Sequence, residues 1–295
     1  MFPVMETTLS LIGFGEAGRT FAIAGGWNGA SVHDRLTDRA DGSAAIRAAY
    51  AVAGVAGRDR LEDAVRGASV VLSLVTADQA LAVATAAAKA IAPGALYCDM
   101  NSVAPDTKRA AARQIDAAGG HYIDVAVMAP VDPARLSVPL MLSGARAGAG
   151  RAALAALGFT RIDIVGDGVG RASSIKMIRS VMVKGIEALS AECALAAAAA
   201  GVSAEVFASL DAGGRPKPWA ERADYNLDRM MIHGLRRAAE MEEVVKTLDA
   251  LGSGSTMTRG TVLRQRAIGK LGLQRPAPGL SAKIAQINDD RRQAT

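Results

Sequence analysis

Three glycines near the start of the chain have the spacing of a dinucleotide-binding turn. Gly13, Gly15 and Gly18 follow an apolar run at residues 9–12, and a helical pattern begins after them. The first glycine permits a tight turn, the second lets backbone approach a pyrophosphate, and the third lets the helix pack against the strand. The helix N-terminus adds unpaired N–H groups and a partial positive charge. The residues predicted to bind the dinucleotide here are Gly13, Phe14, Gly15, Glu16, Ala17 and Gly18.

An acidic residue after the second apolar stretch bears on the choice of cofactor. Asp34 follows residues 30–33 at the distance from the glycine turn that ribose recognition requires. Its carboxylate can accept both ribose hydroxyls and repels a 2′-phosphate, which favours NAD. Arg35 comes next, and an arginine there can instead pair with that phosphate. We predict NAD or NADP, with NAD favoured, and a purely structural glycine turn is the alternative.

A lysine after a second glycine-rich segment is the candidate for proton transfer. Lys176 follows Gly168-Val169-Gly170 and lies early in a helical pattern, with Ser180, Lys184 and Glu187 on the same face. These residues form a polar stripe opposite an apolar face. A lysine that is partly desolvated near a domain junction has a lowered pKa and can donate or accept a proton. The alternative for any single lysine is an ordinary surface residue.

Composition limits the class of protein. The chain has 295 residues, half of them apolar and only 4% aromatic, which suits one large or two ordinary domains. Cys98 and Cys193 match no metal-binding spacing and indicate a reducing compartment without disulfides, so we expect no metal site. The first strand begins too early for a signal peptide, and no apolar run is long enough to span a membrane. We therefore expect a cytoplasmic protein.

The net charge of +5 lies entirely in the second part of the chain. Lysine and arginine balance aspartate and glutamate over residues 1–165 and exceed them afterwards. The excess fits either an anionic small-molecule substrate in a basic pocket or solvated helix surfaces. We do not expect nucleic acid as a partner, because acids interrupt the basic residues and no aromatic stacking platform accompanies them.

The first 165 residues alternate short apolar runs with helical patterns, which predicts an α/β fold with a doubly wound parallel sheet covered on both faces. The predicted strands are Leu9–Gly13, Ala30–Asp34, Ser69–Val75, Leu96–Asp99, Tyr122–Val127, Leu140–Ser143 and Arg161–Ile164. Because parallel strands end at one edge, Val75, Thr76 and Asn101 are expected beside the cofactor.

The remainder reads as helical. One long helix is predicted over 171–200, with others over 227–251 and 255–271, and the tail after Pro276 is expected to be less ordered. The predicted domains are therefore a dinucleotide-binding domain at 1–166 and an all-helical domain for substrate and dimerisation at 167–295, joined by the long helix.

The order of these segments resembles the β-hydroxyacid dehydrogenase family, which includes 3-hydroxyisobutyrate and 6-phosphogluconate dehydrogenases. The resemblance rests on residues 13–18, 99–102, 124–130 and 168–176, and residues 231–241 resemble a bacterial variant whose C-terminal part has no settled function. It implies a Rossmann-type first domain and Lys176 as the catalytic acid/base. It also implies that the segment 99–102, which includes Asn101, lies beside the nicotinamide half of the cofactor.

The substrate half departs from the family pattern. The family's Ser-Gly-Gly, which binds a substrate carboxylate, is replaced by Met128-Ala129-Pro130, which has no hydroxyl and, at the proline, no N–H. Ser180 stands where the family has asparagine, and His233 aligns with a later lysine. His233 is either a second proton carrier or hydrogen-bond donor, or an ordinary helix histidine. The residues predicted to contact substrate are Asn101, Met128, Ala129, Ser180 and His233.

These observations predict an NAD(P)-dependent oxidoreductase acting on a hydroxyl/carbonyl pair. An imine reductase on the same scaffold is one alternative, because it needs less carboxylate recognition. A dinucleotide-binding protein without turnover is another. The family resemblance and the long apolar helix face also predict a homodimer.

Overall fold

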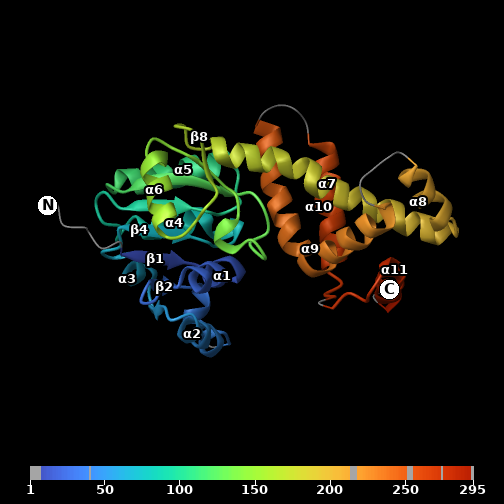
Figure 1. Cartoon of the computed structure of the whole chain (residues 1–295), viewed down its shortest axis with the longest axis horizontal. Coiled ribbons are helices and arrows are strands. Elements are labelled where there is room, and N and C mark those ends of the chain that lie inside the picture. Colours follow the sequence, from blue (N-terminus) through green and yellow to red (C-terminus); the bar gives the residue numbers. More distant parts are fainter. Residues whose placement is uncertain (1–7, 40, 213–217, 251–254, 274, 294–295) are drawn as a thin grey trace. The chain divides into compact units, whose positions relative to one another are not determined.

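The computed structural model describes residues 8–39, 41–212, 218–250, 255–273 and 275–293 (Figure 1). The chain divides into two compact units, Met1–Met177 and Ile178–Thr295. The division falls inside helix α7 (Arg171–Ala200). The predicted domain boundary, after residue 166, lies earlier, at the end of the last strand, β8 (Ile162–Gly166). The candidate lysine, Lys176, therefore belongs to the first unit.

Unit 1 is built on one eight-stranded sheet of order β3-β2-β1-β4-β5-β6-β7-β8. The other strands are β1 (Leu9–Ile12), β2 (Ser31–His33), β3 (Ala56–Gly57), β4 (Val70–Ser73), β5 (Leu96–Asp99), β6 (His121–Val127) and β7 (Leu140–Ser143). Strands β1 to β6 are parallel, as predicted. The two-residue edge strand β3 was not predicted.

Strand β7 departs from the predicted parallel arrangement, because it runs antiparallel to β6. The connection between them contains only the short 3₁₀ helix η3 (Arg135–Ser137). A parallel return needs a longer crossover, usually a helix, so the chain turns back instead. Strand β8 then pairs parallel to β7.

Helices cover both faces of the sheet, each over its own apolar cluster. Side chains of α1 (Glu16–Gly25), α2 (Ser43–Val52) and α6 (Ala147–Ala156) pack on one face, around Phe21, Tyr50 and Leu154. Those of α3 (Leu61–Val65), α4 (Ala80–Ala87) and α5 (Pro105–Ala117) pack on the other, around Tyr97 and Ile115. Strands buried on both faces explain the continuous apolar runs in the sequence. The fold class predicted from sequence is confirmed for this unit.

The described residues of unit 2 form helices joined by loops, and none of them forms a strand. It contains the rest of α7 with α8 (Ser203–Asp211), α9 (Trp219–Ala250), α10 (Thr256–Gly269) and α11 (Leu280–Gln293). The expectation of a less ordered tail was wrong: Ile284 and Ile287 of α11 are buried in the core of the unit. Lys283 also binds Asp224 and Asp228 of α9, at 2.5 and 3.0 Å. No helix among the described residues is both long and apolar enough to cross a membrane.

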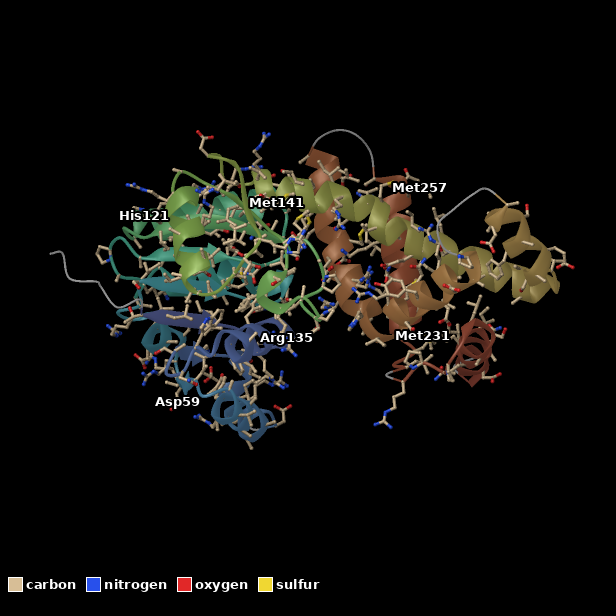
Figure 2. The ribbon with its side chains drawn as sticks, viewed as in Figure 1. Asp59, His121, Arg135, Met141, Met231 and Met257 are labelled. Carbon is tan, nitrogen blue, oxygen red and sulfur yellow. The ribbon has the colours of Figure 1, made fainter. Side chains whose placement is uncertain are left out.

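Helix α7 turns its polar stripe inward. Ser180, Lys184 and Glu187 are each at most 7% exposed, whereas Met182 and Leu189 are 64% and 51% exposed. We predicted that the two faces are opposite, and the structure shows that the polar one packs within the unit. The outward apolar face continues onto α10, where Met257 is 63% exposed, in contrast to buried Met231 of α9 (Figure 2).

Candidate functional site

The glycine turn has the geometry that its sequence predicts. Gly13 has φ +93°, and a Cβ there would lie 2.4 Å from the carbonyl oxygen of Leu74. A Cβ on Gly18 would lie 2.5 Å from the carbonyl oxygen of Gly13, so this glycine allows α1 to pack closely against the turn. Only glycine satisfies both positions without a shift of the backbone.

The start of helix α1 is open to a ligand. Gly15 is its N-cap and provides no side-chain hydrogen bond, and a Cβ built on Gly15 would meet nothing within 4 Å. The first N–H groups of a helix are therefore directed into accessible space with the positive end of the helix dipole. Glu16 is exposed and Ala17 partly buried. The turn fits a dinucleotide pyrophosphate.

Asp34 joins this turn to the end of β2. One carboxylate oxygen accepts the N–H of Phe14 at 2.7 Å, and the other accepts the N–H of Leu36 at 2.9 Å. Each oxygen keeps a further lone pair for a ribose hydroxyl. The Phe14 ring is buried and packs edge-on against Tyr50, so Phe14 contributes to the turn through its backbone. Arg35 is exposed beside Asp34.

Asn101 holds the ends of two neighbouring strands together. Its side-chain oxygen accepts the N–H of Val75 at 2.6 Å, and its side-chain nitrogen donates to Ser73 at 2.9 Å. Because Asn101 is only 4% exposed, its side chain sets the backbone after β4. Thr76, the residue after Val75, is exposed. Its hydroxyl forms a hydrogen bond with the Asp78 carboxylate, and this bond is the largest cause of the lowered pKa of Asp78.

Lys176 lies at the same edge of the sheet. Its ammonium group donates a hydrogen bond to the Ser102 hydroxyl, and both residues are partly buried. Ser102 was not among the predicted site residues, although it directly follows Asn101 in the segment 99–102, on which the family resemblance partly rests. The carboxyl edge thus gathers the glycine turn after β1, Asn101 and Ser102 after β5, and Lys176 of α7.

A row of polar residues crosses the sheet beneath this edge. Ser73, Asp99, Asp124 and Ser143 are paired neighbours on four adjacent strands, and all are fully buried. The ammonium group of Lys108, also fully buried, lies 2.9 Å from an Asp99 oxygen and 3.5 Å from an Asp124 oxygen. A positive charge between the two carboxylates offsets the cost of burying them.

Tyr122 completes the surroundings of Asp99. Its hydroxyl donates to the second Asp99 oxygen at 2.5 Å. Burial raises the pKa of Tyr122 well above its ordinary value, and the negative charge of Asp99 raises it further. The phenol therefore remains a protonated donor. Burial likewise raises the pKa of the Cys98 thiol to about 12, so this cysteine is an inert part of the core.

The residues that replace the family's Ser-Gly-Gly follow β6. Met128 is partly buried and its N–H donates to the Pro139 carbonyl at 2.9 Å. Ala129 and Pro130 are exposed. This segment thus offers no side-chain hydroxyl to a ligand, as the sequence indicated.

The polar stripe of unit 2 pairs with α9. Lys184 lies 3.0 Å from a Glu240 oxygen and 3.3 Å from the Ser180 hydroxyl. Glu187 binds Arg237 and accepts a hydrogen bond from Gln265 of α10 at 3.2 Å. Ser180 is therefore a buried member of this stripe.

The structure does not bring Ser180 and His233 together. Lys184 meets Glu240 and Glu187 meets Arg237, so α7 and α9 are antiparallel. The same spacing places His233 level with Ala191, about 16 Å along α7 from Ser180. Ala191 and Met230 share one apolar cluster, which agrees with this register. His233 is half-buried.

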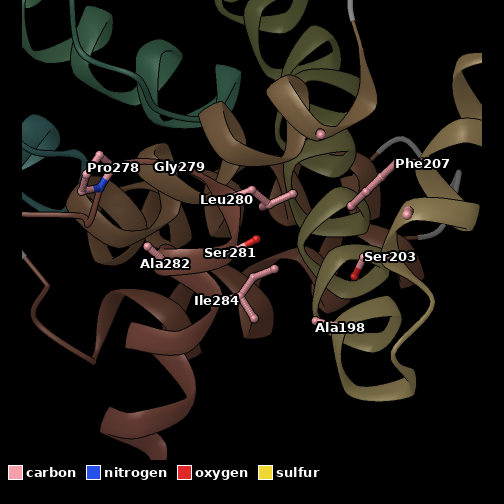
Figure 3. Close-up of a pocket in the computed structure, with 11 residues that line it drawn as sticks. Ala198, Ser203, Phe207, Pro278, Gly279, Leu280, Ser281, Ala282 and Ile284 are labelled. Atoms are coloured by element: carbon pink, nitrogen blue, oxygen red, sulfur yellow. The ribbon is translucent and has the colours of Figure 1, made fainter.

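Two further kinds of site, a metal site and a second acid–base pocket, find no support among the described residues. No group of three or more histidine, cysteine, aspartate or glutamate side chains is placed there to hold a metal. A hollow of about 560 Å³ in unit 2 is lined by residues such as Phe207, Leu280 and Ile284 (Figure 3). Its lining contains no titratable side chain, so it lacks the groups that acid–base chemistry requires.

Comparison with known families agrees with this geometry. The family described as the NAD binding domain of 6-phosphogluconate dehydrogenase matches residues 8–158. The chain belongs to this family. A domain of unknown function, DUF1932, matches residues 197–268. This member of the 6-phosphogluconate dehydrogenase-like family thus combines a nicotinamide-dinucleotide domain with a helical domain of unassigned role.

Solved structures extend the comparison over the whole chain. A conserved hypothetical protein from Sinorhizobium meliloti 1021 is 35% identical, with a TM-score of 0.74 over 98% of each chain. A 3-hydroxyisobutyrate dehydrogenase from Mycobacterium tuberculosis is 19% identical, with a TM-score of 0.69 over 96% of this chain and 99% of that one. An imine reductase from Streptomyces aurantiacus is 22% identical, with a TM-score of 0.55 over 94% and 98%. The last two share the fold.

Replacing Lys108 with methionine should destabilise the protein strongly. Lys108→Met leaves Asp99 and Asp124 buried without their cation, and breaking a buried ion pair in this way costs about 3–5 kcal/mol. Lys89→Met, at an exposed position, should change the free energy of unfolding by less than about 0.5 kcal/mol. Urea unfolding followed by circular dichroism measures both. Equal stability of the two variants would contradict the ion-pair interpretation.

Proposed function

We propose that this family member is an NAD(P)-dependent oxidoreductase that acts on a hydroxyl/carbonyl pair, with Lys176 as its acid/base. One observation carries the proposal. The carboxyl edge of a single sheet presents both an open dinucleotide turn at Gly15 and a lysine held at Ser102. Ligands of doubly wound sheets bind at this edge.

The residues that would hold the cofactor are the N–H groups at the start of α1, the carboxylate of Asp34 and the backbone after β4 at Val75 and Thr76. When bound, a nicotinamide dinucleotide supplies a hydride acceptor or donor. The Asn101 side chain holds the backbone at Val75 in place by accepting its N–H.

Lys176 would handle the proton. As a neutral amine it takes the proton of a substrate hydroxyl during oxidation, and as an ammonium it returns one during reduction. The Ser102 hydroxyl accepts a hydrogen bond from Lys176 and so restricts where the amine lies. Met128 and Ala129 would border the substrate with less polar surface than Ser-Gly-Gly provides. Roles for Ser180 and His233 in substrate contact stay predictions.

Lys176→Met should lower turnover strongly while leaving the affinity for the cofactor unchanged. Loss of a positioned acid/base lowers kcat by roughly 10²- to 10⁴-fold. Oxidation of 3-hydroxyisobutyrate, L-serine and related hydroxy acids, and reduction of the matching aldehydes, would be followed at 340 nm. NADH affinity, from its fluorescence, should stay unchanged. Lys270→Met, at an exposed lysine of unit 2, is the matched control. Undiminished turnover in Lys176→Met would refute the role of the lysine.

We propose NAD as the preferred cofactor, because the Asp34 carboxylate lies directly beside the turn. Asp34→Asn should weaken NADH binding roughly tenfold or more, as expected for a charge-assisted hydrogen bond, and should narrow the difference between NADH and NADPH. Asp38→Asn, at an exposed carboxylate in the 3₁₀ helix η1 (Arg35–Asp38) that follows Asp34, should change neither affinity. Dissociation constants from fluorescence titration test this, and tighter binding of NADPH by the unaltered protein would show the preference to be wrong.

An imine reductase is the second candidate, favoured by the absence of a hydroxyl at Met128, Ala129 and Pro130. A panel of cyclic imines assayed with NADPH and NADH separates the two activities. Cofactor binding without turnover on either panel would instead support a dinucleotide-binding protein without catalysis.

We also propose a homodimer through the outward faces of α7 and α10. The groove between these helices, about 410 Å³, is lined by Met182, Leu189 and Met257, and exposed apolar surface of this kind marks an interface. A second copy supplies the same apolar face, so the pairing is self-complementary.

Met182→Glu combined with Met257→Glu should convert the dimer to a monomer, because both charges would be buried at the interface. Val52→Glu replaces a side chain that is 82% exposed on unit 1 and should leave the mass unchanged. Light scattering after size-exclusion chromatography measures both variants. A monomeric unaltered protein would rule out the proposed interface.

A further inference from the structure

The first turn of α7 is held by a carboxylate that comes from the sheet. One Asp124 oxygen accepts the N–H groups of Gly170 and Ser173, each at 3.1 Å, and the Ser173 hydroxyl at 3.0 Å. Such bonds satisfy donors that a helix start leaves unpaired, and the negative charge favours the positive end of the helix. A helix cap usually comes from the residue just before the helix, whereas this one comes from a residue of strand β6.

Two further buried side chains, those of Ser143 and Lys108, hold Asp124 in place. Ser143 of β7 donates its hydroxyl to the same Asp124 oxygen at 3.1 Å and accepts the N–H of Ala172 at 3.0 Å. Lys108 of α5 approaches the other oxygen at 3.5 Å. Because Asp124, Ser143 and Lys108 are fully buried, water does not compete for these contacts.

The same buried network extends to the residue before Ser102, the hydrogen-bond partner of Lys176. Lys108 also donates to the side chain of Asp99 at 2.9 Å and to its carbonyl oxygen at 2.6 Å. Asp99 in turn accepts the N–H of Asn101 at 2.9 Å, and Ser102 is the next residue. Ser102 is therefore fixed from the Asp99 end of the network, while Lys176 is fixed one turn beyond the Asp124 end.

We propose that Asp124, joined to Asp99 through Lys108, is the positioning residue that sets Lys176 against Ser102. The two groups that meet at the site depend on opposite ends of one ion-paired network, so loss of Asp124 moves the lysine and leaves the glycine turn untouched. The proposal takes the importance of Lys176 from the proposed function, but the geometry that it predicts is measurable without turnover.

Asp124→Asn tests it, because the side chain keeps its shape and loses its charge. Hydrogen exchange followed by mass spectrometry should show roughly tenfold faster exchange in the first turn of α7, as expected for a weakened cap. After reductive ¹³C-methylation, the NMR signal of Lys176 (assigned by its loss in Lys176→Met) should move to the position that it takes in Ser102→Ala. The dissociation constant of NADH should stay within about twofold, since Asp34 and the turn are unchanged.

Asp116→Asn is the matched control. Asp116 also binds strand β6 through a carboxylate, accepting the N–H of Tyr122 at 3.0 Å, but toward the start of the strand. Neither α7 exchange nor the Lys176 signal should change in this variant.

A native Lys176 signal in folded Asp124→Asn would overturn the proposal. If Asp124→Asn does not fold, Ser143→Ala takes its place, because it removes one hydrogen-bond donor to Asp124 and the acceptor of the Ala172 N–H. A native Lys176 signal in Ser143→Ala would also overturn the proposal. Absence of turnover in the unaltered protein on every substrate panel would sink the proposed function, yet the signal comparison would still decide the role of Asp124.

Discussion

A buried ammonium group between two buried carboxylates is the constraint on which the rest of unit 1 depends. Lys108 cannot leave Asp99 and Asp124 without exposing charge to an apolar interior. The ion pair connects helix α5 to strands β5 and β6 and, through the Asp124 cap, to the start of α7. The network therefore holds three consecutive elements, β5, α5 and β6, against the start of the more distant helix α7.

The register of the sheet makes this arrangement possible. Asp99 and Asp124 are direct neighbours across β5 and β6, with Ser73 and Ser143 beyond them on β4 and β7. Parallel strands bring their ends to a common edge, so a polar row just below that edge can support loops above it. Asn101 does this for Val75, and Asp124 does it for α7. The apolar layers on either side exclude water from the row and strengthen each contact.

The local features of the site could be predicted from the sequence, and the connections between them could not. Gly13 and Gly18 could be recognised as parts of the dinucleotide turn because only glycine fits the backbone there. Asp34 could be recognised because it follows at a fixed distance in the same βαβ unit. Lys108, in contrast, lies in a helical segment that reads as amphipathic. Nothing local distinguishes a lysine that pairs with Asp99 and Asp124 across the sheet from one that faces water. Its role depends on register, which periodicity alone does not supply.

Helix α11 and the faces of α7 show the same limit. The tail beyond Pro276 is polar on average, and its helix is stabilised by contacts that Ile284, Ile287 and Lys283 make with other helices. Periodicity in α7 separates a polar from an apolar face but does not say which one packs inside the unit. That depends on whether another helix offers complementary charges, as α9 does.

The inward polar stripe of α7 has a consequence for specificity. A buried ion pair adds little net stability, but it penalises any packing that separates its members. Lys184 with Glu240, and Glu187 with Arg237, therefore determine which turns of α9 meet which turns of α7. Apolar side chains would tolerate a slip of one turn, whereas these pairs do not. Because the polar face of α7 fixes its register against α9, the apolar face of α7 stays exposed, and it is there that we propose the dimer interface.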